Sequence, residues 1–92
     1  MGDSRSVWKY PLSSFPAIIL VPKGAKILKL AIQDNFPTLW ILVNPEENVE
    51  ERIFDYYGTG FTINNIDHKV YIDTWFNGPF VWHLFEVTDI KK

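Results

Sequence analysis

The residues with the greatest chemical potential in this chain gather around a short glycine-containing segment, Gly58-Thr59-Gly60. Arg52, Tyr56 and Tyr57 precede it within a few residues, on a predicted strand. The glycines allow a positive φ angle and let a partner approach the main chain closely. A cation, flat rings and free backbone N–H groups together suit a planar anionic ligand. The alternative interpretation is a strand that simply ends in a glycine loop.

A second group of suitable residues, Trp8-Lys9-Tyr10, lies near the N-terminus. Nucleobases stack on Trp and Tyr, and phosphates pair with cations or with backbone N–H groups. Arg52 is the expected phosphate anchor because its planar fork can bind phosphate through two hydrogen bonds. The alternatives are that Trp8 and Tyr10 merely cover a sheet face and that Arg52 pairs with Glu50 at the surface. The predicted ligand-binding residues are Trp8, Lys9, Tyr10, Arg52, Tyr56, Tyr57, Gly58, Thr59 and Gly60.

Catalytic and metal-binding patterns are missing from the sequence. His68 and His83 are far apart, and neither has a second ligand at metal-binding spacing. The chain has no cysteine, which excludes thiolate sites and disulfides. Ser13-Ser14 lacks the context of a nucleophile, and the clustered glutamates are most simply a solvated stretch (Glu46, Glu47, Glu50 and Glu51). We therefore expect no enzyme activity, no cofactor and no metal.

Composition indicates one folded domain of 92 residues, with flexible ends at 1–6 and 88–92. Aromatic residues make up 16% of the chain, more than so small a core can bury, so we expect a homo-oligomer, a dimer or a tetramer. The net charge of −2 disfavours binding to duplex nucleic acid. No apolar run reaches the length of a membrane span and no signal region is evident, so we expect a cytoplasmic protein without membrane contact.

Short apolar segments separated by turn signals predict the fold. Turns are indicated at Pro22-Lys23-Gly24, Asp34-Asn35 and Asn77-Gly78. We predict seven strands, at residues 7–10, 17–21, 25–33, 38–43, 49–57, 69–76 and 80–87, and one helical turn within 62–67. The strand at 7–10 is expected at a sheet edge, and the strand at 38–43 is expected in a central position. This spacing predicts an all-β domain with at most one short helical turn, an antiparallel sandwich or partly closed barrel of six to seven short strands.

Strict alternation assigns side chains to the two faces of each strand. Within 25–33 it places Leu28 and Leu30 on one face and Ile27 on the other. Within 69–76 it separates Ile72 from Trp75.

Four motifs occur in this order along the chain: Val7-Trp8-Lys9-Tyr10-Pro11, Val21-Pro22-Lys23-Gly24-Ala25-Lys26-Ile27-Leu28, Leu39-Trp40-Ile41-Leu42-Val43-Asn44-Pro45 and Gly58-Thr59-Gly60. In this the chain resembles a family of small phage-encoded proteins, and it looks similar to the phage sponges that bind cyclic dinucleotides and blunt CBASS anti-phage signalling. The resemblance implies an oligomer that sequesters 3′3′-cyclic GMP-AMP in the host cytoplasm without cleaving it. The alternative is a small phage accessory protein that binds another protein through an exposed sheet edge or aromatic patch. A hydrolase is the least supported class.

Overall fold

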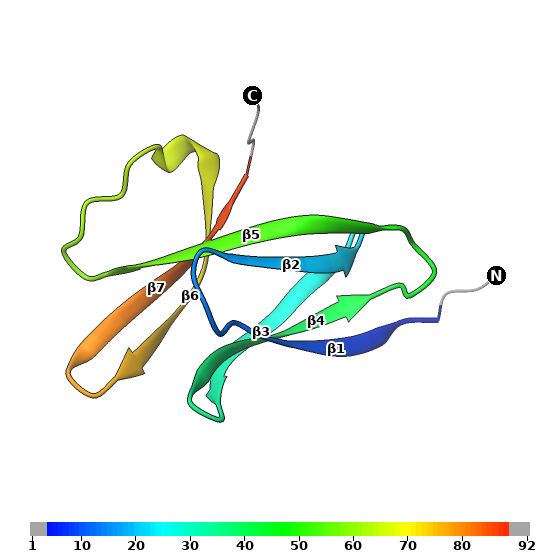
Figure 1. Cartoon of the computed structure of the whole chain (residues 1–92), viewed down its shortest axis with the longest axis horizontal. Helices are drawn as coiled ribbons and strands as arrows, with labels where there is room; N and C mark the ends of the chain where they lie inside the picture. Colours follow the sequence, from blue (N-terminus) through cyan, green and yellow to red (C-terminus); the bar gives the residue numbers. More distant parts are fainter. Residues whose placement is uncertain (1–3, 89–92) are drawn as a thin grey trace.

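The computed structural model describes residues 4–88, and these form seven strands and one short 3₁₀ turn (Figure 1). The all-β fold expected from the sequence is confirmed. The elements are β1 (Ser6–Pro11), β2 (Ala17–Pro22), β3 (Lys26–Gln33), β4 (Phe36–Val43), β5 (Val49–Gly58), η1 (Ile66–His68), β6 (Lys69–Asn77) and β7 (Phe80–Val87).

The strands form two antiparallel sheets that do not close into a barrel. One sheet has three strands in the order β1-β4-β3, and the other has four in the order β2-β5-β7-β6. Figure 1 shows the long β5 beside β2, with β7 and β6 beyond it. β1 is an edge strand and β4 is central in its sheet, as the sequence predicted. The result is a sandwich-like arrangement with open ends.

The core lies between the sheets. Alternate residues of β4, Leu39, Ile41 and Val43, are at most 1% exposed. They face the four-stranded sheet, whose Phe54 and Leu84 are fully buried. Burial of alternate apolar side chains removes their surface from water, which stabilises the fold by about 25 cal/mol per Å² of apolar area buried. This period of two fixes which face of β4 looks outward.

A β-bulge in β3 overturns the predicted alternation there. Ile27 pairs with Ile41, and Lys29 pairs with the next residue of β4, Trp40, so Leu28 is an extra residue in the ladder. Because a bulge adds one unpaired residue to a strand, the residues before and after it no longer follow a single alternation between the two faces. Ile27 consequently packs against the core, whereas Leu28 is 48% exposed. The assignment of Leu28 to the face of Leu30 was therefore wrong.

A second bulge lies in β6, between Tyr71 and Asp73. It brings both Ile72 and Trp75 to the core, where Trp75 is 9% exposed. Strict alternation had separated these two residues, so this prediction was also wrong. The bulge thus places the Trp75 side chain between the sheets.

Tight turns join the hairpins at the predicted places. Asp34 and Asn35 both have positive φ angles in the β3–β4 turn, and Gly78 does so in the β6–β7 turn. The helical turn occupies Ile66–His68, which overlaps the end of the predicted range 62–67 and extends one residue beyond it. The predicted flexible ends lie partly outside the described residues. Within these predicted ends, Ser6 begins β1, and the Thr88 N–H donates a hydrogen bond to the His68 carbonyl at 2.7 Å.

Within residues 4–88, no helix has the length and apolar character needed to cross a membrane.

Candidate functional site: an aromatic cleft between the sheets

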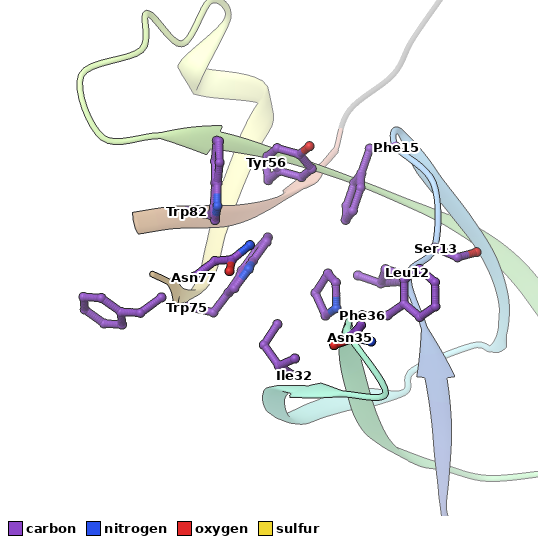
Figure 2. Close-up of a pocket in the computed structure, with 12 residues that line it drawn as sticks. Leu12, Ser13, Phe15, Ile32, Asn35, Phe36, Tyr56, Trp75, Asn77 and Trp82 are labelled. Carbon is purple, nitrogen blue, oxygen red and sulfur yellow. The ribbon is translucent and has the colours of Figure 1, made fainter. Parts of the chain in front are cut away.

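An open cleft of about 560 Å³ lies between the two sheets, at the end where the β3–β4 and β6–β7 hairpins turn (Figure 2). Its wall is assembled from five segments far apart in the sequence. The β1–β2 connection provides Leu12, Ser13 and Phe15, and the β3–β4 hairpin provides Ile32, Asn35, Phe36 and Pro37. The four-stranded sheet provides Tyr56, Trp75, Phe76, Asn77 and Trp82.

Tyr56 contacts each of the other three rings that form the aromatic wall of the cleft. Its ring makes edge-to-face contacts with Phe15, Trp75 and Trp82, at centroid distances of 4.5, 5.7 and 5.2 Å. Such contacts are favourable beyond simple burial and hold each ring in a defined orientation. Four rings from four separate segments are thus pre-arranged around one opening, as Figure 2 shows.

Gly58 positions the indole of Trp82. A Cβ at this glycine would lie 2.9 Å from the Phe61 ring and 3.0 Å from the Trp82 ring. The absence of a side chain therefore allows both rings to pack against the backbone. Phe61 and Phe80 also contact Trp82, each at a centroid distance of 6.0 Å. The glycine segment thus supports the cleft wall through Trp82.

The polar groups at the cleft are two amides and a hydroxyl. Asn35, Asn77 and Ser13 are exposed, and their side chains make no hydrogen bond to the described part of the chain. An amide offers both donors and an acceptor, so it can pair with the polar edge of a heterocycle. The twelve described lining residues include no carboxylate, histidine, lysine or arginine. The site therefore suits a flat, largely neutral chemical group.

The nine predicted site residues do not gather at one place. Tyr56 lines the cleft, and Gly58 packs against Trp82, which is also in the cleft wall. Gly60 is exposed, and no atom lies within 4 Å of the position that a Cβ would take there. Thr59 ties the glycine segment to β7, because its N–H donates to the Val81 carbonyl at 3.1 Å. The Thr59 hydroxyl also lies 2.8 Å from Nε2 of His83.

Arg52 is engaged in a partly buried ion pair with Glu86. Its Nε and Nη2 atoms donate to the two carboxylate oxygens, each at 2.7 Å, and Nη1 donates to the Ala25 carbonyl at 2.9 Å. The hydrogen bonds to Glu86 raise the pKa of the guanidinium, against the opposing effect of burial. The partner is thus a cross-strand carboxylate, and not the neighbouring Glu50 considered from the sequence. Binding of a ligand phosphate by Arg52 stays a prediction.

The remaining candidates lie on other surfaces. Tyr57 contacts Phe85 at 5.8 Å, and its pKa is raised by burial and, to a smaller extent, by Asp55. Tyr10 packs against the core, and burial raises its pKa. Trp8 is 38% exposed on β1, in the other sheet. Lys9, also on β1, is exposed.

Sequence reasoning missed most of the cleft. Phe15, Trp75 and Trp82 were assigned to a loop and to strands without a binding role, and Asn35 and Asn77 were treated only as turn residues. One signal was available. Both asparagines stand in predicted tight turns next to aromatic residues, Phe36 and Phe76, and hairpin ends at one side of a sandwich meet around its opening.

Among residues 4–88, no group of three or more potential metal ligands comes together.

The family described as a domain of unknown function (DUF7352) matches residues 3–92. All of the cleft residues lie within the matched region. No curated protein and no solved structure matches the chain.

Proposed function

We propose that this chain, which belongs to the DUF7352 family, binds a nucleotide through its bases in the aromatic cleft and releases it unchanged. One observation carries the proposal. Phe15, Tyr56, Trp75 and Trp82 converge on a single opening that also presents free amide groups. Rings supply the stacking surface that every base can use, and amides supply donors and acceptors for its edge.

A cyclic dinucleotide such as 3′3′-cyclic GMP-AMP is the proposed ligand, in line with the sequence resemblance to phage sponges. Its two bases offer two flat surfaces, and the cleft of about 560 Å³ offers rings on more than one wall. The lining has no cation, so the phosphates would remain at the solvent side of the opening. Stacking contributes roughly 1–3 kcal/mol per base, enough to provide much of the affinity. A phage-encoded sponge of this kind would act in the cytoplasm of the host.

Sequestration without cleavage is consistent with the chemistry of the lining. Hydrolysis of a phosphodiester needs a positioned base, a metal ion or another activated nucleophile. The described lining residues offer a hydroxyl, two amides and aromatic rings. A binding protein needs only affinity and sufficient copies, and this arrangement supports that role.

Isothermal titration with 3′3′-cyclic GMP-AMP tests the proposal, with Asn77→Asp as the site variant. The new carboxylate keeps the size of the amide but removes its N–H donors and adds charge near the phosphates, so affinity should fall about tenfold. Asn64→Asp is the matched control, because Asn64 is exposed in the loop before η1 and does not line the cleft. The ligand recovered after incubation should be intact by chromatography. No binding by wild type at roughly 100 μM would refute the proposal.

A second function, binding to another protein or to further copies of the chain, is favoured by the outer face of the four-stranded sheet. Three large apolar side chains on this face are more than half exposed: Ile18 at 59%, Leu20 at 57% and Tyr71 at 53%. Strand register places them on the side away from the core. Exposed apolar patches of this kind often mark interfaces. The proposed homo-oligomer, a dimer or tetramer, would use this face.

A further inference from the structure

The outer face of the three-stranded sheet has a different character, with an indole flanked by cations. Trp40 of β4 pairs directly with Lys9 of β1 on one side and with Lys29 of β3 on the other. Residues directly opposite in an antiparallel pair have their side chains on the same face. Because the neighbouring Leu39 and Ile41 point into the core, this row points outward. Trp40 is half-buried, and both lysines are exposed.

A hydrogen bond confirms how the row is arranged. Nζ of Lys9 donates to Oε1 of Gln33 at 2.8 Å, so the lysine side chain passes from β1 over β4 to β3. Lys26 adds a further exposed cation to this face, since it pairs with Leu42, two residues along β4 from Trp40. Two residues of a strand span about 7 Å, so cations recur along the strand at that spacing.

The positive charge continues into a shallow hollow of about 240 Å³ at one end of the face. Arg5, Lys23 and Lys26 line it together with Asn44, and Glu47 is its one carboxylate. Strands β1, β3 and β4 themselves contain no aspartate or glutamate. The one ion pair within residues 4–88 joins Arg52 to Glu86 of the other sheet. The cations around Trp40 are therefore not neutralised by ion pairs within the described chain.

We propose that this basic face, formed by Trp40, Lys9, Lys29, Lys26 and the hollow, binds single-stranded nucleic acid. An unpaired base would stack on Trp40, while the phosphates on either side of it would contact the lysines. A flat sheet face with a ring between rows of cations suits unstacked bases, which a duplex does not offer. This site is separate from the aromatic cleft and does not depend on the function proposed for it.

Fluorescence anisotropy with a labelled oligothymidine tests this proposal. The wild type should bind at about 50 mM salt and lose affinity as salt increases, because single strands release roughly 0.7 counterions per neutralised phosphate. The double variant Lys9→Gln, Lys29→Gln should bind about tenfold more weakly, and its log–log salt slope should be shallower by about 1.4. Lys69→Gln is the control for loss of a cation elsewhere, because it removes one positive charge from β6 of the other sheet.

A stacking variant distinguishes base contact from simple charge attraction. Trp40→Phe keeps a ring in the half-buried site and should lower the affinity less than Trp40→Ala, with folding of both variants checked by circular dichroism. Equal losses in the lysine double variant and in Lys69→Gln would overturn the proposal, as would no binding by wild type at low salt. Vesicles containing phosphatidylserine are the competing probe, and preferential binding to them over the oligonucleotide would also overturn it.

Discussion

The indole of Trp82 packs over Gly58 so closely that a Cβ at the glycine would lie 3.0 Å from the ring. This contact connects the glycine segment, the most conspicuous feature of the sequence, with the aromatic cleft. Trp82 in turn contacts Tyr56 in the cleft wall, at a centroid distance of 5.2 Å. The backbone at Gly58 thus helps to set the position of Trp82 in the cleft wall.

Gly58→Ala should therefore disturb both stability and binding. The added methyl group would displace the rings of Phe61 and Trp82, and overpacking of this kind costs about 1–3 kcal/mol. Denaturant unfolding would measure the loss, and near-ultraviolet circular dichroism would report the altered aromatic packing. Gly60→Ala is the control for adding a methyl group to this segment, because space is open there although its φ of +93° adds strain. If only Gly60→Ala changes the aromatic signal, the assigned role of Gly58 is wrong.

Arg52→Ala should lower stability because it leaves the partly buried Glu86 carboxylate without its partner. The side chains of the pair are 17% and 14% exposed, so solvent screens them only in part. We expect a loss of about 1–3 kcal/mol in the free energy of unfolding. A double-mutant cycle with Glu86→Ala should give a coupling energy above about 0.5 kcal/mol. If the cleft alone holds the ligand, the folded variant should bind cyclic GMP-AMP like wild type, whereas a large loss of affinity would support Arg52 as the phosphate anchor predicted from the sequence.

Stability should fall in alkaline solution through Tyr10 and Tyr57. Burial raises the pKa of both side chains, and Asp55 adds to the effect at Tyr57. An unfolded tyrosine ionises near pH 10, so these groups contribute stability below that pH and lose it as pH rises through their higher folded pKa values. Urea unfolding between about pH 8 and 11 should show the decline, and Tyr10→Phe should make it shallower. An unchanged slope in Tyr10→Phe would contradict the contribution of this side chain.

The outer face of the four-stranded sheet should control self-association. Ile18→Lys combined with Leu20→Lys would place two charges on the exposed edge strand β2, and light scattering should then report a smaller mass than for wild type. Ile66→Lys is the control, because Ile66 is 52% exposed but lies in η1. A wild-type mass equal to that of a monomer would remove the proposed homo-oligomer.

The fold was accessible from the sequence because turns and apolar runs are local signals. Asp34-Asn35 and Asn77-Gly78 mark hairpins directly, and the continuously apolar β4 predicts a central strand. The two bulges were not accessible in this way. Their signal is the match of one strand to its partner, such as Ile27 and Lys29 against consecutive residues of β4, and alternation within one strand does not contain it.

The site was less accessible because its residues meet only through tertiary structure. Tyr56 was identified because it stands near the glycine segment, whereas Phe15 and Trp75 reach the same cleft from distant segments. Arg52 illustrates the converse case. Its chemistry suits phosphate, but Glu86, 34 residues away, occupies its hydrogen-bonding groups in the fold.

The most direct test of the central claim is titration of wild type and Trp82→Ala with 3′3′-cyclic GMP-AMP, at a temperature where circular dichroism shows both proteins folded. Loss of one stacking ring should weaken binding by roughly 1–3 kcal/mol, or about five- to 150-fold. Trp8→Ala, which tests the alternative placement of the site on β1, should bind like wild type. Equal affinity of wild type and Trp82→Ala, with a loss in Trp8→Ala, would contradict the assignment of the site to the aromatic cleft.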